Sequence, residues 1–163
     1  MNSSSKVKEY LLNLLDMDKS ERNGTEDEIK TEDEIKTEED NFPHYLENKT
    51  YLIMQQEIKD VCIRNNINND GDKILTKLRE YRYVDKICDL VRGKFVRWIR
   101  IPTRDDVVAS LTKGGIVTDI KFLENGIHVL IKNALNRFIQ YKFDECITFQ
   151  KLSVEELLFL KLL

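Results

Sequence analysis

The stretch LTKGGIVTDIKFLENGIHVLIKN, from Leu111 to Asn133, decides the fold of this 163-residue chain. Apolar side chains recur at every second position along most of 116–123 and again along 127–132, which is the two-residue period of a half-buried β-strand. Asn125-Gly126 lies between the two runs, and this pair favours the tight turn in which both central residues take positive φ. The sequence therefore predicts an antiparallel hairpin turning at Asn125-Gly126, preceded by Gly114-Gly115 at the opening of its first strand.

Three further strands are predicted around this hairpin. Residues 95–101 (FVRWIRI) alternate and end at Pro102, and the loop from Thr103 to Ser110 has room for one helical turn capped by Thr103. Alternation resumes along 138–143 after a turn at 133–136, and a last short strand is expected at 146–151, with Ile147 and Phe149 on one face. Five short strands joined by tight turns predict a small antiparallel barrel or a strongly bent meander.

Two helices are predicted before the strands. Thr50 is placed to cap a helix over 51–67, whose apolar stripe comprises Met54, Ile58, Val61 and Cys62. A second helix is expected from Asp72 to Arg92, because apolar side chains keep the helical period there and Gly93 follows as a stop signal.

Both ends of the chain carry apolar helical patterns. Ser153 and Glu156 form a capping box before a final helix that is apolar around most of its circumference, so it must be buried against the domain or a partner. Residues 6–18 predict a short amphipathic helix that is marginal in water unless it docks on a surface. The candidate docking residues of the two helices are Val7, Leu11, Leu14, Leu15, Leu157, Phe159 and Leu160.

An acidic segment separates the first helix from the rest. Residues 25–40 contain two copies of TEDEIK and a truncated third, a repeat with too few apolar side chains to fold alone. Residues 1–40 hold 6 Lys and Arg against 13 Asp and Glu, a net −7, whereas residues 41–163 hold 20 against 16, a net +4. The predicted order is a docking helix (1–19), an acidic linker (20–41), a two-helix segment (42–93) and a small β-barrel with its closing helix (94–163). The linker is either solvated spacer or an acidic arm that binds a basic partner or the chain's own basic face.

Sequence patterns of catalysis are absent. The chain has two His and three Cys, with no CxxC, no nucleotide-binding glycine loop and no metalloprotease motif. His128 is predicted to be a satisfied or solvent-facing strand residue, and the three thiols are expected to be reduced. We therefore expect a non-enzymatic protein without a cofactor, a metal ion or a small-molecule substrate. Without a signal-peptide pattern or a membrane-spanning run, the expected location is cytoplasmic or virion-associated, not secreted.

One basic stretch interleaves cations with aromatic rings, the pattern that lets cations meet phosphates while rings stack on bases. Its candidate contact residues are Arg92, Lys94, Arg97, Trp98, Arg100 and Arg104. The opposing interpretation places Trp98 in the core and the arginines in salt bridges at the rim. The folded part is only mildly basic, which favours the second interpretation.

The strand pattern resembles small SH3-like barrels. The step Lys113-Gly114-Gly115-Ile116-Val117 is similar to the turn and strand of KOW and Tudor-type barrels, in which a glycine after a basic residue opens a strand. GKFVRWI (93–99) followed by GGIV (114–117) also resembles uncharacterised proteins of large nucleocytoplasmic DNA viruses. That resemblance implies a non-enzymatic accessory or virion protein, such as a minor capsid component.

The sequence thus predicts an α+β protein with N-terminal helices, a five-stranded antiparallel SH3-like barrel or meander, and a C-terminal helix. The leading functional hypothesis is a non-catalytic structural or protein-interaction protein whose partner is another copy or a capsid protein. The alternative is a nucleic-acid-binding barrel that uses the stretch from Arg92 to Arg104.

Overall fold

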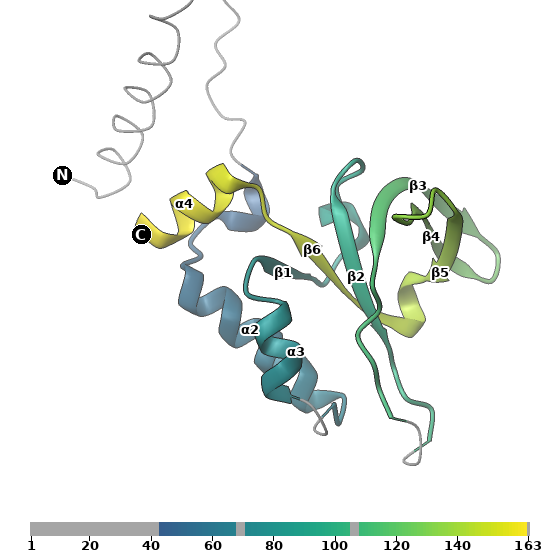
Figure 1. Cartoon of the computed structure of the whole chain (residues 1–163), viewed down its shortest axis with the longest axis horizontal. Helices are drawn as coiled ribbons and strands as arrows, with labels where there is room; N and C mark the ends of the chain where they lie inside the picture. Colours follow the sequence, from purple (N-terminus) through teal and green to yellow (C-terminus); the bar gives the residue numbers. More distant parts are fainter. Residues whose placement is uncertain (1–42, 68–70, 105–107, 163) are drawn as a thin grey trace, which may run out of the picture.

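The chain forms an α+β structure around one six-stranded antiparallel sheet with the strand order β1-β6-β2-β3-β4-β5 (Figure 1). The computed structural model describes residues 43–67, 71–104 and 108–162. Its strands are β1 (Tyr81–Val84), β2 (Phe95–Arg100), β3 (Gly115–Leu123), β4 (Gly126–Lys132), β5 (Phe138–Lys142) and β6 (Cys146–Lys151). Its helices are α2 (Tyr51–Arg64), α3 (Gly71–Lys77) and α4 (Val154–Leu162), with 3-10 turns η2 (His44–Leu46), η3 (Ile87–Asp89) and η4 (Phe143–Glu145). The first two predicted segments, 1–19 and 20–41, lie outside the described residues.

The predicted hairpin is confirmed as β3 and β4, but its turn differs from the prediction. Glu124 and Asn125 are the two turn residues, and Gly126 already pairs with Leu123. Gly126 has a φ of +121°, whereas Asn125 is not among the residues with positive φ. Glycine takes a positive φ without the steric penalty of a side chain. In this turn Gly126 is the residue with a positive φ, so neither Glu124 nor Asn125 has to adopt that conformation.

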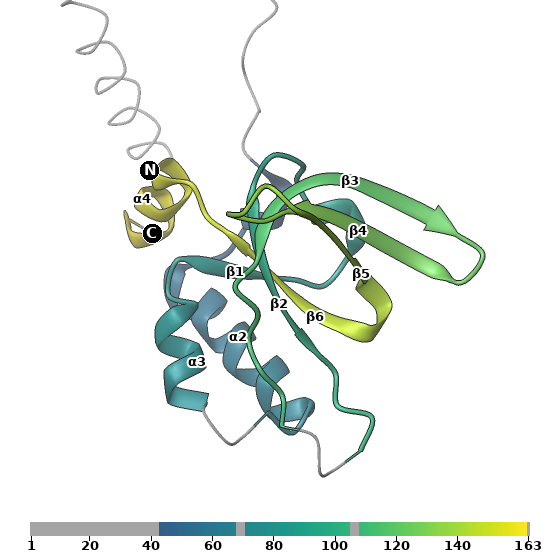
Figure 2. The ribbon, with the colours of Figure 1, turned by 45° about the vertical axis from the view of Figure 1, so that its right-hand side comes forward.

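The Gly114-Gly115 pair is required where β3 passes between β2 and β4. Gly114 has a φ of +83°, and a Cβ on it would lie 2.0 Å from the Val96 carbonyl oxygen. A Cβ on Gly115 would lie 2.5 Å from the Lys132 carbonyl oxygen. β3 pairs with β2 at only two positions and beyond them pairs with β4 alone. The hairpin formed by β3 and β4 therefore projects from the rest of the molecule (Figure 2).

The sheet is open and has six strands, so the predictions of five strands and a closed barrel are not met. The extra strand, β1, falls inside the stretch from Asp72 to Arg92, where the prediction of one continuous helix is wrong. α3 ends at Lys77, and Tyr81–Val84 pairs with β6 instead. Aromatic and β-branched residues favour strands, and this pairing satisfies the backbone groups along one side of β6. The sheet therefore contains one strand from before and five strands from after the boundary predicted at residue 93.

Several other predicted elements are confirmed. α2 covers most of the first predicted helix, and the Thr50 hydroxyl accepts a hydrogen bond from the Ile53 amide at 3.3 Å, as an N-cap does. β2, β5 and β6 occupy the predicted stretches. The helical turn expected in the loop after β2 is not observed at residues 103–104 or 108–110, and residues 105–107 lie outside the described part.

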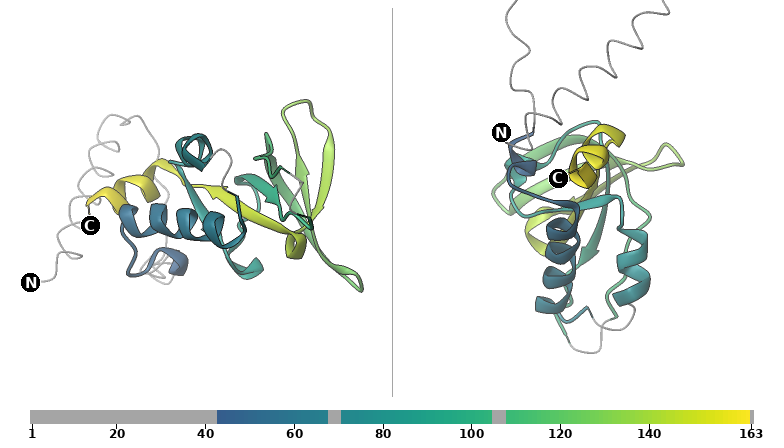
Figure 3. Two further views of the ribbon diagram at one scale, coloured as in Figure 1. Left: turned by 90° about the horizontal axis from the view of Figure 1, so that it is seen from below. Right: turned by 90° about the vertical axis from the view of Figure 1, so that its left-hand side faces the viewer.

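The core lies on both faces of β2 and β6. On one face α2 and α3 pack against Ile99, Ile147 and Phe149, which are at most 3% exposed. On the other face the curved strands enclose Trp98 and Tyr141 with their neighbours. A third, smaller cluster joins α4 to α2 and η2 through Leu46, Met54, Leu152 and Leu160. The helices α2 and α4 therefore lie at one end of the molecule and the β3–β4 hairpin at the other (Figure 3).

Candidate interaction site

Helix α4 begins with the predicted capping box. The Ser153 hydroxyl accepts a hydrogen bond from the Glu156 amide at 3.2 Å, and Glu156 Oε2 accepts one from the Ser153 amide at 2.6 Å. These reciprocal bonds satisfy two of the amides that a helix leaves open at its N-terminus. The confirmed capping box sets the point at which the chain leaves β6 and turns into the helix.

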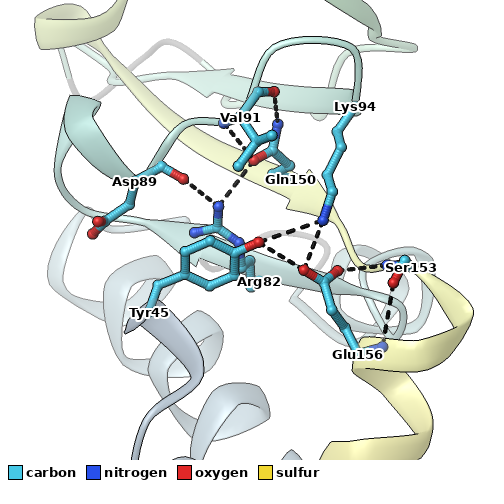
Figure 4. Close-up of polar contacts among 8 residues, drawn as sticks. All are labelled: Tyr45, Arg82, Asp89, Val91, Lys94, Gln150, Ser153 and Glu156. Atoms are coloured by element: carbon cyan, nitrogen blue, oxygen red, sulfur yellow. Dashed lines mark hydrogen bonds and ion pairs between the residues drawn. The ribbon is translucent and has the colours of Figure 1, made fainter. Parts of the chain in front are cut away.

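The same carboxylate also joins α4 to two other parts of the fold (Figure 4). Glu156 is 6% exposed, and its Oε1 accepts hydrogen bonds from the Tyr45 hydroxyl and the Lys94 ammonium, each at 2.6 Å. Burial alone would raise the pKa of Glu156. The hydrogen bonds from Lys94, Tyr45 and the Ser153 amide outweigh burial and hold that pKa below its ordinary value. The start of β2, η2 and α4 are thus tied together at one buried charge.

A second buried polar group lies next to this carboxylate. Arg82 of β1 is 3% exposed, and its guanidinium carbon lies 3.6 Å from the centre of the Tyr45 ring. Arg82 donates to Gln150 Oε1 at 2.9 Å and to the Asp89 carbonyl, while Gln150 bonds both backbone groups of Val91 at 2.7 and 3.0 Å. Burial lowers the pKa of Arg82. These contacts fix the segment between β1 and β2.

Sequence reasoning missed Arg82 and Gln150. Arg82 lies in the stretch that was wrongly predicted to be a helix, and a charged residue in an amphipathic helix is expected to face solvent. Gln150 lies in a correctly predicted strand, but the prediction placed only one face of β6 in the core. The burial of both Phe149 and Gln150, each 0% exposed, shows that both faces of this strand are covered. A central position in the sheet is a tertiary property that the local pattern does not record.

Helix α4 has one buried face and one exposed apolar face. Leu160 is 1% exposed and packs in the cluster with Leu46 and Met54. On the other side Val154, Leu158 and Leu162 are 69%, 45% and 50% exposed. Residues spaced by four lie above one another on a helix, so these three form a continuous row, here named the α4 stripe.

The predicted docking residues of this helix are divided between the two faces. Leu160 belongs to the core, while Leu157 and Phe159 are half-buried. The exposed row falls on three positions that the prediction did not single out. Lys161 lies 5.7 Å from the centre of the Tyr51 ring, which places the end of α4 beside the first turn of α2. Leu52 and Ile53 in that turn are 78% and 45% exposed, so apolar surface extends around this end of the molecule. The N-terminal docking residues Val7, Leu11, Leu14 and Leu15 lie outside the described residues.

Most of the predicted basic contact residues have partners within the fold. Arg92 pairs with Asp119 at 3.1 Å, Lys94 with Glu156 at 2.6 Å, and Arg100 with Glu145 at 3.3 Å. Arg97 donates from Nε to the Thr112 carbonyl at 2.7 Å. Arg104 is exposed in the loop after β2. Lys94 and Arg97 are therefore engaged within the fold, whereas the side chains of Arg92 and Arg100 stay 62% and 78% exposed in their ion pairs.

Trp98 is a core residue, as the opposing interpretation predicts. It is 8% exposed, and its ring stacks on Tyr141 with centroids 4.2 Å apart and planes 11° apart. Stacking of two aromatic rings adds to the free energy gained by burying them. The ring is occupied on this side by another aromatic side chain, so it does not offer a free surface to a nucleotide base.

A hollow with a volume of about 510 Å³ lies between η2, α2 and β1. Its charged side chains balance, with four Lys or Arg facing four acidic residues: Lys49, Arg64, Arg82, Lys86, Glu57, Asp60, Asp85 and Asp89. No group of three His, Cys, Asp or Glu side chains in the described ranges is arranged to hold a metal ion.

The surroundings of two thiols and one histidine account for the low reactivity of the thiols and the satisfied ring nitrogens of the histidine. Burial raises the pKa of Cys62, and it raises the pKa of Cys146 to about 11, so both are protonated and weakly nucleophilic at neutral pH. His128 is 7% exposed and lies within hydrogen-bonding distance of Asn125 Oδ1 at 3.0 Å and Gln140 Nε2 at 2.6 Å. Of the two predicted environments, satisfied or solvent-facing, the structure shows the satisfied one.

Comparisons with family models, with curated proteins and with solved structures found no match to this chain. Among the residues that the structure describes, no helix is long and apolar enough to cross a bilayer.

Proposed function

We propose that this chain is a non-catalytic protein-interaction protein that binds its partner through the α4 stripe. The observation that carries the proposal is the contrast between the two faces of one nine-residue helix. One face is fixed to the fold by Glu156 and Leu160, and the other presents Val154, Leu158 and Leu162 to solvent.

Rigid presentation makes this row suitable for binding. An apolar helix face that inserts into a groove is a common recognition mode, with anchors three or four residues apart. Because the capping box and the buried carboxylate hold the helix in place, binding requires little further ordering of the backbone, and less free energy is lost to entropy. Full burial of a Leu or Val side chain contributes roughly 1.5–3 kcal/mol, so three anchors support a specific contact.

The proposal also includes an SH3-like fold and a place in a virus particle. The curved sheet has its inner face filled by Trp98 and Tyr141, and this supports an incomplete small barrel of the SH3-like kind. The resemblance to proteins of large DNA viruses supports a minor component of a virus particle, in the cytoplasm or in the virion.

Partner capture from the native source tests the proposal. We expect proteins retained by the full chain at high salt to be lost from Leu158→Asp, because an apolar contact is insensitive to salt and a carboxylate is costly to bury. The matched control is Leu135→Asp, which places the same charge on a residue that is 72% exposed in the turn before β5. Equal retention by both variants would contradict the proposal.

Nucleic-acid binding through Arg92–Arg104 stays the alternative prediction. It requires cations that are free to meet phosphates, and its test is the dependence of single-strand affinity on salt. The burial of Trp98 and the internal partners of Lys94 and Arg97 favour the interaction proposal over this alternative, whereas Arg92 and Arg100 stay 62% and 78% exposed in their ion pairs.

A further inference from the structure

The α4 stripe matches a segment of the same chain that lies outside the described residues. The sequence predicts an amphipathic helix over 6–18, with an apolar row formed by Val7, Leu11, Leu14 and Leu15. We propose that this N-terminal segment docks on the α4 stripe of its own chain, parallel to α4. The inference rests on the proposed function, because it names what covers the same surface when no partner is bound.

The point where the N-terminal segment joins the fold supports docking within one chain. The described chain starts at Pro43 and enters η2, where Leu46 packs in the same cluster as Leu160. The Tyr45 hydroxyl donates to Glu156 in the first turn of α4 at 2.6 Å. The 42 residues that precede Pro43 are therefore attached beside the beginning of α4.

The connecting chain is long enough for this arrangement. Residues 19–42 connect the predicted helix to Pro43, and an extended chain spans up to about 3.3–3.6 Å per residue. α4 has nine residues and is about 13–14 Å long at 1.5 Å per residue. The connection therefore reaches from either end of α4 back to Pro43. Attachment within one chain also replaces a bimolecular encounter with an intramolecular one, at an effective concentration that reaches the millimolar range for short linkers.

The two apolar rows have the same length. Val154 and Leu162 are eight residues apart, and so are Val7 and Leu15. Each row therefore spans about 12 Å in a helix. Both consist of aliphatic side chains at spacings of three or four, the spacing at which helices pack side chain into groove. The N-terminal segment alone is marginal in water, and the α4 stripe gives it the surface that it needs.

Charges at the ends of the two rows select the parallel direction. On the side of the predicted helix that carries the apolar row, Lys8 lies near the beginning and Asp18 near the end. α4 has the exposed Glu155 in its first turn and the exposed Lys161 in its last. Parallel packing brings Lys8 to Glu155 and Asp18 to Lys161, whereas antiparallel packing opposes like charges.

Docking in this way regulates the proposed binding site. A partner must displace the N-terminal segment, so the apparent affinity for the partner is reduced by the fraction of chains in which the stripe is covered. Substitutions that weaken the N-terminal row therefore increase partner binding without any change on α4.

Photo-crosslinking in the full chain tests the inference. Leu158 is replaced by the apolar photo-crosslinking amino acid p-benzoylphenylalanine, and the protein is irradiated as an equal mixture of 14N and 15N forms. We expect mass spectrometry to show crosslinks to residues 7–15 without mixing of the isotopes. The same amino acid at Val154 should reach Val7, and at Leu162 it should reach Leu14 or Leu15. Isotopically mixed products, which identify a second copy, or the reversed pattern would overturn the inference.

Matched variants show whether the crosslink depends on the apolar row. Leu11→Asp with Leu14→Asp should reduce the crosslink yield at least tenfold, whereas Asn13→Asp, which adds a charge on the opposite side of the predicted helix, should leave it unchanged. Equal yields from these variants would overturn the inference. The capture assay on Leu158→Asp measures the proposed function separately, so partner loss in that assay without a crosslink to 7–15 rejects the inference alone.

Discussion

The sequence predicted contact surfaces on two parts of the described chain, helix α4 and strand β2. The two differ in how far their side chains are buried or paired within the fold. In β2 the aromatic ring is buried and the arginines find partners within the fold. In α4 three apolar side chains remain between 45% and 69% exposed. Charged and aromatic residues have many ways to be satisfied internally, whereas an exposed aliphatic row gains free energy only when another surface covers it.

The same comparison separates the two faces of α4. Substitutions on the face that contains Glu156 and Leu160 should destabilise the fold, whereas substitutions on the α4 stripe should change the binding of a partner and of the N-terminal segment, with little effect on the fold. The following predictions test that division and are arranged from the largest expected effect to the smallest.

Leu160→Ala should cost about 3 kcal/mol of the free energy of unfolding, since it leaves a cavity at a side chain that is 1% exposed. Urea unfolding followed by the fluorescence of Trp98, the only tryptophan, measures the effect. The matched control is Leu158→Ala on the other face, for which we expect a change within about 0.5 kcal/mol. Similar losses in both variants would show that the two faces of α4 are not distinct.

Glu156→Gln should cost roughly 1.5–3 kcal/mol at neutral pH, because it removes the charge that accepts hydrogen bonds from Lys94 and Tyr45. Glutamine is compatible with the capping box, so the helix start is kept. The pKa of Glu156 is held below its ordinary value of 4.5, so its contribution is present above about pH 4.5 and is lost as pH falls through the lower, folded-state pKa. Unfolding curves of both proteins should therefore converge below that range, and a difference independent of pH would contradict this account.

Trp98→Phe should cost about 1–2 kcal/mol, because the smaller ring leaves space in the core and loses part of the stack on Tyr141. A binding measurement accompanies the stability measurement. Adding a single-stranded oligonucleotide to the unsubstituted chain should leave Trp98 fluorescence unchanged, since the ring is buried. Quenching that saturates with oligonucleotide would favour the nucleic-acid alternative.

Arg100→Gln should have little effect on the fold, since its ion pair with Glu145 is exposed and such pairs contribute little. Weak oligonucleotide binding, where any is detected, should keep the same salt dependence in this variant. A slope of log affinity against log salt that falls by about one unit would identify Arg100 as a phosphate contact and strengthen the alternative for β2.

The elements that the sequence predicted well have strong local signals. The hairpin of β3 and β4, the Thr50 cap and the Ser153–Glu156 capping box depend on neighbouring residues alone, and all three are present. β1 was missed because Tyr81 and Val84 keep a helical spacing, while the pairing that makes them a strand comes from β6, some 70 residues later in the chain. Non-local pairing overrides local periodicity in that case.

The site was predictable in kind but not in detail. The apolar composition of the last helix predicted that the helix must pack against another surface. Because the helix is apolar on most sides, the sequence did not indicate which side faces the fold. Leu160 is buried because it packs with Leu46 and Met54, whereas Leu158, on the other side of the helix, is 45% exposed. Arg82 and Gln150 became buried only through the fold itself, and no local pattern distinguishes them.

The most direct test of the central claim is a paired measurement on Leu158→Asp in the full chain. Unfolding by urea and capture of the native partner at high salt are measured on the same preparation. We predict that the free energy of unfolding changes by no more than about 0.5 kcal/mol, while partner recovery falls at least tenfold. A variant that is equally stable and recovers the partner as fully as the unsubstituted chain would contradict the claim that the α4 stripe is the binding surface.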